Sequence, residues 1–217
     1  MNRKTAFLIC STVLLSTNIS ILTRIYADEK QTVNTSKIVD GKEESFTDET
    51  IESNTVDTSV ICNQNGGTVT INKNTLHKSG DTNNEDGKNA VVFTTGSSFT
   101  KIDQSDLQST SKGSSGIVAN EKAMVYANDS SIMTSNDSAN GLEAYSNGQI
   151  IANKMDITTQ GNQSAAVYAK QSDGSISLTN STLSTDGNNA PLLYANGTIE
   201  VDNVSGTASH SKIAEVE

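Results

Sequence analysis

The sequence predicts an all-β solenoid whose coils contain about 25 residues each, and three observations support this fold class. Apolar residues recur at a fixed period, with Val92, Ile117, Leu142, Val167 and Leu192 each 25 residues apart, and such a period is typical of repeat architectures. Apolar and polar residues alternate within each unit, which indicates short strands. Gly, Asn, Asp and Ser, which favour turns, separate these stretches, and no window predicts an amphipathic helix.

Two further apolar ladders run in step with the first. The second consists of Leu76, Leu107, Ile132, Ile157, Leu183 and Val204. The third lies five residues earlier in each unit and consists of Ile71, Ile102, Ala127, Ala152, Leu178 and Ile199. From the second ladder to the first the gap is 16 residues in the first unit and 9 or 10 in the others, so six extra residues lie within 81–88. We expect a loop insertion there, because the register resumes after it.

The first segment, residues 1–27, has the features of a secretory signal peptide. Arg3 and Lys4 precede an apolar stretch at 6–15, and Ala27 precedes an acidic start of the mature chain. The apolar stretch is too short to span a bilayer comfortably. We therefore expect a secreted or cell-surface protein that is not inserted in a membrane once this segment is removed.

The mature chain divides into two segments. Residues 28–59 are polar, acidic and weakly periodic, and we interpret them as a leader that is partly disordered or forms a first partial coil; residues 60–217 hold the repeats. Without residues 1–27 the chain has 12 lysines, no arginine and 25 acidic residues, for a net charge of −13. That balance argues against nucleic acid and anionic membranes as partners, since both require basic surface.

The repeat units resemble those of a known group of proteins. The units QIIANKMDITTQGNQSAAVYA (149–169) and SISLTNSTLSTDGNNAPLLYANG (175–197) are similar to exported right-handed β-helix repeat proteins of Gram-positive bacteria, which share the pectate-lyase-like fold and are often called adhesin-like. The likeness covers about residues 60–217 and implies a single-stranded, right-handed parallel β-helix. The chain stops in the middle of an expected strand after Lys212, without a recognisable cap or wall anchor. We expect a truncated product that self-associates through its uncovered last coil.

The fold that this resemblance implies also occurs in carbohydrate-active enzymes. Its lyases use an Arg or Lys base with Ca²⁺ held by clustered Asp, and its hydrolases use Gly-His-Gly and Arg-x-Lys; the mature chain has no arginine and neither tripeptide. We interpret His77 and His210, in polar and turn-like contexts, as solvated surface residues. Cys62, in an alternating Val-Ile-Cys stretch, is interpreted as a small apolar core residue, and it can form no intrachain disulfide after cleavage.

Three acidic residues in the inserted segment, Asp81, Glu85 and Asp86, are the best candidates for a metal site. Carboxylate and carbonyl oxygens are the ligands that Ca²⁺ prefers. The segment has no EF-hand spacing and no Gly-Gly-x-Gly-x-Asp repeat. We therefore interpret it as a solvated acidic loop and assign no metal.

The aromatic residues offer two interpretations. Phe93, Tyr168 and Tyr194 each follow an apolar residue of a similar strand, so they are able to line one outer face as a sugar-binding platform. Packing at coil corners is the alternative, because Val118 and Glu143 interrupt the series. The other aromatic residues of the mature chain considered for this role are Phe46, Phe99, Tyr126 and Tyr145.

A polar column is expected beside the third ladder. Asn72, Asp103, Asn128 and Asn153 fall at equivalent positions. We interpret them as a buried stack that satisfies backbone groups at the coil turns, because such groups are costly to bury unpaired. The column is therefore structural and is not assigned to ligand binding.

The sequence favours a non-catalytic protein with an adhesin-like binding or structural role. A glycan or a host- or cell-surface protein is the expected partner. The alternatives are a pectate-lyase-like carbohydrate-active enzyme and a truncated product without independent function. No catalytic, cofactor-binding or metal-ligating residue is assigned.

Overall fold

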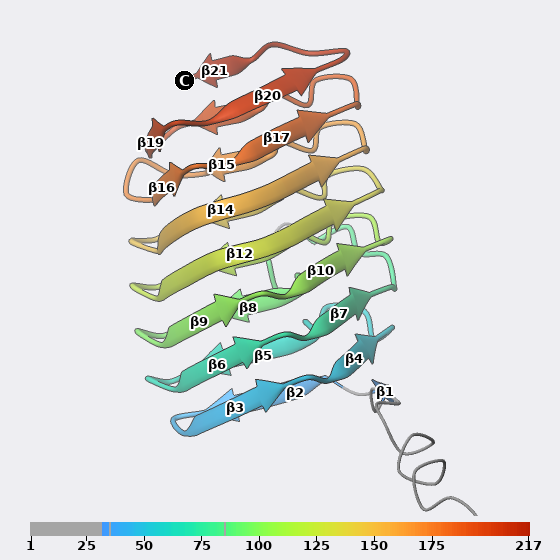
Figure 1. Ribbon diagram of the computed structural model, residues 1–217, viewed down its shortest axis with the longest axis vertical. Helices are drawn as coiled ribbons and strands as arrows, with labels where there is room; N and C mark the ends of the chain where they lie inside the picture. Colours follow the sequence, from blue (N-terminus) through green and yellow to red (C-terminus); the bar gives the residue numbers. More distant parts are fainter. Residues whose placement is uncertain (1–31, 35, 85) are drawn as a thin grey trace, which may run out of the picture. The chain divides into compact units, whose positions relative to one another are not determined.

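The computed structural model describes residues 32–34, 36–84 and 86–217, which wind into a β-solenoid of about seven turns (Figure 1). Within these ranges no residue lies in an α-helix, and every strand pair is parallel, with about 25 residues per turn. No helix among them has the length and hydropathy needed to cross a membrane. The expected signal peptide, residues 1–27, and Glu85 lie outside the described residues.

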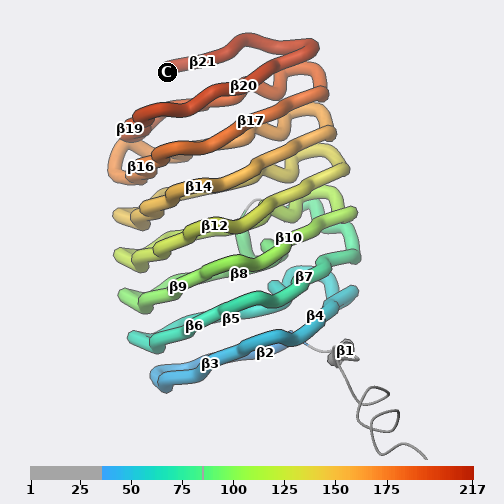
Figure 2. The backbone as a smooth tube through the Cα atoms, viewed as in Figure 1, coloured from blue at the N-terminus to red at the C-terminus, as the bar shows by residue number. Residues whose placement is uncertain are grey.

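One sheet takes a single strand from each coil and has eight strands. In spatial order they are β2 (Lys37–Asp40), β5 (Ile61–Gln64), β8 (Val92–Thr94), β11 (Ile117–Ala119), β13 (Leu142–Ala144), β15 (Val167–Ala169), β18 (Leu193–Ala195) and β21 (Ala214–Val216). Figure 2 shows the successive coils stacked along the axis of the solenoid. Residues 37–53 contribute three consecutive strands, β2 to β4, which pair with β5 to β7 of the next coil.

The other sheet has thirteen strands in two neighbouring rows. One row contains β3 (Glu43–Thr47), β6 (Thr68–Asn72), β9 (Phe99–Asp103), β16 (Ser175–Thr179) and β19 (Thr198–Asp202). The second contains β1 (Thr32–Asn34), β4 (Thr50–Ser53), β7 (Thr75–Lys78), β10 (Asp106–Ser109), β17 (Thr182–Thr185) and β20 (Ser205–Ala208). Two long strands, β12 (Met124–Thr134) and β14 (Gln149–Thr159), run through both rows and join them into one sheet.

The strand register confirms most of the three ladders. The first pairs Val92 with Ile117, Ile117 with Leu142 and Leu142 with Val167. The second is continuous from Leu76 to Leu183, and the third from Ile71 to Leu178. The insertion is confirmed as well, since Ile61 pairs with Val92, 31 residues later.

The first ladder was wrong in its last step. Val167 pairs with Leu193, not with Leu192, because this coil is one residue longer than its predecessors. The extra residue lies in the turn 170–174 between β15 and β16, which has five residues where the corresponding turn 145–148 has four. Leu192, the predicted residue, immediately precedes the observed one and is buried in the same core.

The other two ladders were wrong in the last coil as well. The turn between β18 and β19 contains only residues 196–197, which shortens this coil, but by less than the predicted ladders assumed, so the observed partners lie two residues later than predicted. The observed pairs are Leu178 with Val201 instead of Ile199, and Leu183 with Gly206 instead of Val204. The parallel stacking itself continues unchanged.

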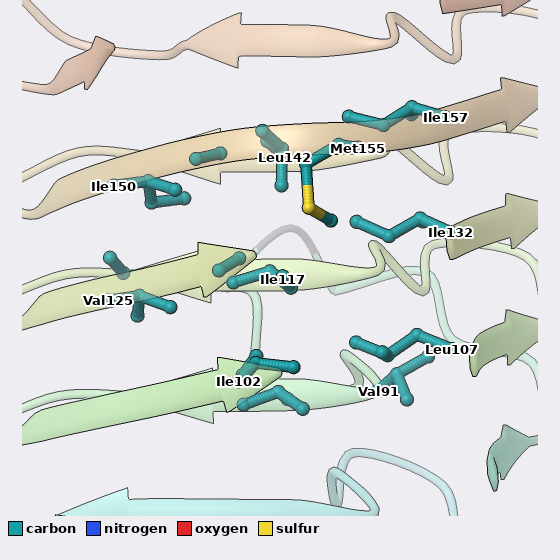
Figure 3. Close-up of a cluster of buried hydrophobic side chains, with 14 of the residues drawn as sticks. Val91, Ile102, Leu107, Ile117, Val125, Ile132, Leu142, Ile150, Met155 and Ile157 are labelled. Carbon is teal, nitrogen blue, oxygen red and sulfur yellow. The ribbon is translucent and has the colours of Figure 1, made fainter. Parts of the chain in front are cut away.

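The inward side chains of both sheets form one apolar core that follows the axis of the solenoid. Figure 3 shows Leu107, Ile132 and Ile157 one above another, with Ile117 and Leu142 across from them. All five side chains are almost completely buried. Burial of each such residue contributes about 1.5–3 kcal/mol to folding, so the stacked columns are the main source of stability.

The predicted polar column is present, but its interpretation was wrong in two respects. Asn72, Asp103, Asn128 and Asn153 are half-buried rather than buried. Three of them bond to one another: the Asn128 amide donates to Asp103 and the Asn153 amide to Asn128, both at 2.8 Å. Buried backbone N–H groups are satisfied by a neighbouring column, each member of which accepts from the preceding coil: Asn74, Ser105, Ser130 and Ser181.

Candidate functional site

The outward side chains of the eight-stranded sheet form one column, with one residue per coil. In order they are Ile38, Cys62, Phe93, Val118, Glu143, Tyr168, Tyr194 and Glu215. The predicted position of Phe93, Tyr168 and Tyr194 on one outer face is therefore confirmed. The alternative interpretation, that these residues pack at coil corners, was wrong, because they lie within strands.

Cys62 belongs to this outer column and not to the core, so its interpretation as a core residue was wrong. The alternation of β5 directs Ile61 inward, and Cys62 therefore faces outward. Its thiol is half-buried and lies 3.8 Å from the Gln64 side-chain oxygen. Burial raises the pKa of this thiol, so it stays protonated at neutral pH.

The inserted loop, described at residues 79–84 and 86–91, folds over part of the outer column. Ala90 of the loop packs with Phe93, Val118 and Tyr145 in a second apolar cluster, separate from the core. Gly87 makes this approach possible: its φ is +74°, and a Cβ at this position would lie 2.8 Å from a Val118 methyl group. The loop therefore takes Phe93 away from solvent and leaves the later coils uncovered.

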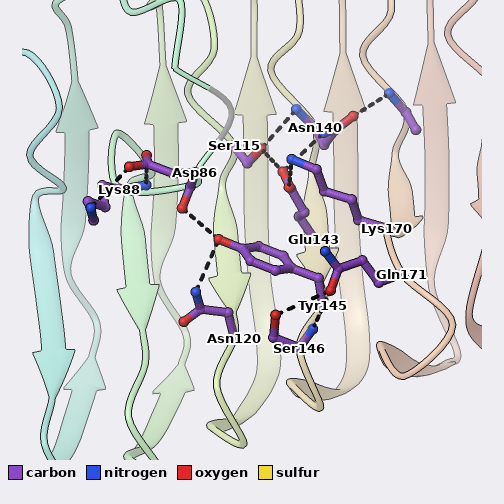
Figure 4. Close-up of polar contacts among 11 residues, drawn as sticks. Asp86, Lys88, Ser115, Asn120, Asn140, Glu143, Tyr145, Ser146, Lys170 and Gln171 are labelled. Atoms are coloured by element: carbon purple, nitrogen blue, oxygen red, sulfur yellow. Dashed lines mark hydrogen bonds and ion pairs between the residues drawn. The ribbon is translucent and has the colours of Figure 1, made fainter.

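Tyr145 ties the loop to the sheet (Figure 4). Its hydroxyl donates to the backbone oxygen of Asp86 at 2.5 Å and accepts from the Asn120 amide at 3.1 Å. Burial, with a smaller effect from the Glu143 charge, raises the pKa of Tyr145 well above its usual range. The hydroxyl is therefore a reliable hydrogen-bond donor to the loop at neutral pH.

A groove of about 380 Å³ begins where the loop ends. Its floor is the second half of the outer column, from Glu143 through Tyr168 and Tyr194 to Glu215. Loop residues including Gly87 border it at one end. The groove therefore runs along the solenoid axis, across four neighbouring strands.

Two stacked tyrosines form the aromatic part of the floor. The rings of Tyr168 and Tyr194 are nearly parallel, with an interplanar angle of 7° and centroids 4.7 Å apart. Parallel stacking in register dictates this contact, since successive strands are separated by about 4.8 Å. The pKa of Tyr194 is raised to about 12, chiefly by a hydrogen bond with Glu217 and to a smaller extent by loss of water. Its phenol is therefore neutral at physiological pH.

Glu143 is the most buried charged residue of the groove, with about 5% of its side chain exposed. Its Oε2 accepts hydrogen bonds from the Ser115 hydroxyl at 2.8 Å and the Asn140 amide at 3.2 Å. Its Oε1 lies 3.3 Å from Lys170 Nζ, as an ion pair. Figure 4 shows these groups converging on the carboxylate from both sides. The buried charge is therefore fully paired, as burial requires.

One rim of the groove repeats with the solenoid. Ser138, Gln163 and Asn189 line it from three successive turns, and each has a positive φ of 52–55°. The backbone N–H groups of Ser138 and Gln163 donate to the next coil, which holds these turns in register. Hydroxyl and amide groups therefore recur along the rim at the spacing of the coils, where they are able to bond a ligand that extends along the groove.

The acidic residues considered for Ca²⁺ do not converge. Asp81 accepts a hydrogen bond from the backbone N–H of Lys112 at 2.8 Å, and Asp86 forms an ion pair with Lys88 at 3.1 Å. Among the described residues, which exclude Glu85, no three His, Cys, Asp or Glu side chains are grouped as a metal site.

Lys78 is a buried lysine beneath the loop, where the coils before and after have serine. Its Nζ donates to the backbone oxygens of Ser79, at 2.7 Å, and Thr55, at 3.1 Å. Loss of water lowers the pKa of Lys78 to about 8, although the charges of Asp57 and Asp81 oppose this. Since the amine holds the start of the loop, we assign it a structural role.

Neither histidine lines the groove. His77 is half-buried in strand β7, so its expected turn-like context was wrong. His210 is exposed, and its Nδ1 lies 3.4 Å from the Asp186 carboxylate. These positions give neither residue a part in the groove.

The remaining aromatic residues lie elsewhere. Phe46 is buried in the core. Phe99 and Tyr126 meet edge to face on the thirteen-stranded sheet, with centroids 5.6 Å apart. Tyr126 is 41% exposed there, which makes it a useful control for the tyrosines of the groove.

Comparisons with known proteins leave the groove as the main guide to function. Sequence reasoning missed the groups around Glu143, which it treated only as an interruption of the aromatic series. The signal available was the spacing, because Ser115, Asn140 and Ala165 recur at 25 residues beside that column. No protein-family model matches this chain, and neither a curated protein nor a solved structure does.

Proposed function

We propose that this chain is a secreted or cell-surface binding protein. It binds a glycan in the groove on its eight-stranded sheet and does not catalyse a reaction of that glycan. The observation that carries the proposal is the stacked pair Tyr168–Tyr194 beside a repeating polar rim. Ligand sites combine apolar or aromatic surface with a few placed polar groups, and this groove has both.

The chemistry of the groove suits a sugar chain. The C–H faces of a pyranose pack against aromatic rings, while its hydroxyl groups need donors and acceptors at the sides. Tyr168 and Tyr194 offer the rings, and Ser138, Gln163 and Asn189 offer hydroxyl and amide groups along one rim. An extended chain of sugars lying along the solenoid axis would meet both sets of groups.

The charge of the groove selects against polyanions. The floor carries two carboxylates, Glu143 and Glu215, against the single cation Lys170 that already pairs with Glu143. The whole chain has a net charge of −10. Because like charges repel across such a surface, we propose a neutral or weakly basic glycan as the ligand rather than nucleic acid or a polyuronate.

The separation of the carboxylates favours binding over hydrolysis. Glu143 and Glu215 are three strand spacings apart in the same column, which corresponds to about 14 Å. Glycoside hydrolases place their two carboxyl groups about 5–9.5 Å apart. Both oxygens of Glu143 are also engaged by Ser115, Asn140 and Lys170. The alternative is a carbohydrate-active enzyme, and the experiment below distinguishes it from a binding protein.

A glycan array followed by titration calorimetry tests the proposal. The full chain is applied to the array, and the strongest neutral glycan is titrated into the wild type and into Tyr168→Ala and Tyr194→Ala. Loss of one stacking ring is expected to weaken binding about tenfold, which corresponds to about 1.4 kcal/mol.

Tyr126→Ala is the matched control, since it removes an exposed tyrosine from the other sheet. It is expected to leave the affinity unchanged. Equal losses in all three variants, or an array without bound neutral glycans, would contradict the proposal. Release of shortened or unsaturated sugars during the incubation would support the enzyme alternative instead.

A further inference from the structure

An amine and an amide meet at the same buried carboxylate in this groove. Lys170 Nζ lies 3.3 Å from Glu143 Oε1, and Asn140 Nδ2 donates to Glu143 Oε2 at 3.2 Å. Lys170 follows β15 and Asn140 precedes β13, so the two side chains come from neighbouring coils. Figure 4 shows the lysine side chain extended toward both Glu143 and Asn140.

We propose that Lys170 and Asn140 form an intramolecular isopeptide bond, with Glu143 as the catalytic acid and base. The carboxylate takes a proton from the lysine ammonium, and the freed Nζ attacks Cγ of Asn140. The new bond joins Nζ to Cγ. Glu143 returns this proton to Nδ2 and takes the second proton from Nζ, so that a neutral amide forms as the bond from Cγ to Nδ2 breaks. Nδ2 leaves as ammonia and carries the second proton away as ammonium. No oxidant, reductant or cofactor is needed.

The surroundings of Asn140 prepare its carbonyl for this attack. Its Oδ1 accepts a hydrogen bond from the backbone N–H of Ala165 at 2.9 Å, which polarises the carbonyl and stabilises the negative charge that develops on oxygen. Its Nδ2 already faces the carboxylate that must protonate the leaving group. The amine and the amide thus both contact the catalytic carboxylate before reaction, which lowers the entropic part of the barrier.

The surroundings of Lys170 hold its amine beside the carboxylate that must take its proton. About 22% of its side chain is exposed, and its Nζ lies 5.4 Å from the centre of the Tyr145 ring. Glu143, which takes the proton, is almost completely buried. The ion pair therefore holds the amine directly against the group that must take its proton.

The Asn140–Gly141 sequence offers a competing reaction that also releases ammonia. In an exposed loop the backbone nitrogen of Gly141 attacks the asparagine side chain and forms a succinimide. Here that nitrogen donates to the backbone oxygen of Ala165 at 3.0 Å, as part of the ladder between coils. The backbone is therefore held away from this reaction, and the lysine is the better-placed nucleophile.

The intact mass of the denatured full chain tests the proposal. The wild type is expected to be lighter than its sequence by one ammonia per molecule. Tandem mass spectrometry after proteolysis should find a branched peptide that joins Lys170 to Asn140. Lys170→Arg keeps the positive charge beside Glu143 and should restore the full mass, as should Glu143→Gln.

Lys212→Arg is the matched control, because Lys212 is an exposed lysine paired with the neighbouring Glu215. It should keep the loss of ammonia. A wild type of full mass would overturn the proposal. So would a loss of ammonia that persists in Lys170→Arg, since this would identify a succinimide. None of these mass measurements depends on glycan binding, so each proposal is tested independently of the other.

Discussion

At the scale of single residues, Lys78 shows how one buried charge accommodates an insertion. Its side chain is fully buried, and its amine bonds to backbone oxygens at the start of the loop. Serine occupies this place in the adjacent coils, which have no loop to hold. The amine satisfies oxygens that a serine would not reach, but its charge loses hydration.

The Lys78 pKa leads to a prediction about stability and pH. The pKa is lowered from 10.5 to about 8 in the folded state, mainly by burial. Below pH 8 both states are protonated and the full penalty of the buried charge is present. Between pH 8 and 10.5 the unfolded state binds more protons, so the contribution of Lys78 to stability rises with pH.

The measurement compares wild type with Lys78→Met by urea denaturation at several pH values. The difference in free energy of unfolding, wild type minus variant, should increase by up to about 3 kcal/mol between pH 7 and 10.5. Other titrating groups occur in both proteins and cancel in the difference. A difference that does not change with pH would show that the folded lysine keeps its ordinary pKa.

At the scale of elements, the inserted loop divides the outer face into a covered half and an open half. Phe93 and Val118 lie beneath it, whereas Tyr168 and Tyr194 lie in the groove beyond it. The loop thus forms one end of the groove and determines at which coil the groove begins. Its attachment depends on the apolar cluster and on the two hydrogen bonds of the Tyr145 hydroxyl.

Tyr145→Phe is expected to loosen this loop without disturbing the core. The variant keeps the ring in the apolar cluster but leaves the Asp86 oxygen and the Asn120 amide without this partner, which costs about 1–2 kcal/mol. Hydrogen exchange of residues 79–91 should become faster, while exchange in β12 and β14 stays slow. Tyr126→Phe is the control, and equal exchange in the two variants would rule out the hydroxyl as the anchor.

At the scale of the whole molecule, the 25-residue period predicts the architecture and most of the register. It fails where two leucines are adjacent, because either Leu192 or Leu193 fits an apolar ladder and only the length of the preceding turn decides between them. Turn length has no periodic signal. The aromatic half of the groove was predictable from alternation, since Tyr168 and Tyr194 share a strand position.

The polar half of the groove was not predictable in the same way. Glu143 breaks the aromatic series, and alternation alone does not show that Asn140 and Lys170 reach it from neighbouring coils. Such contacts depend on side-chain length and on the shape of the turns at the ends of short strands. A periodic sequence therefore predicts which residues share a face more reliably than it predicts which polar groups meet.

Stability in a solenoid depends on contacts between neighbouring coils, and Leu142 tests this dependence. The side chain is fully buried, and its strand pairs with the coils on both sides. Leu142→Ala should lower the free energy of unfolding by about 3–5 kcal/mol, because the ladders on both sides keep the stack from collapsing into the cavity. Coupling between the coils on either side should weaken as well, which reduces the slope of the urea transition.

Ile151→Ala is the matched control in the same coil, since Ile151 faces outward and is 37% exposed. Its cost should be below about 1 kcal/mol, with an unchanged slope. Both variants are measured by circular dichroism during urea denaturation. A Leu142→Ala transition that keeps the wild-type slope would show that the coils unfold as one unit and that coupling passes through the backbone ladders rather than through the core column.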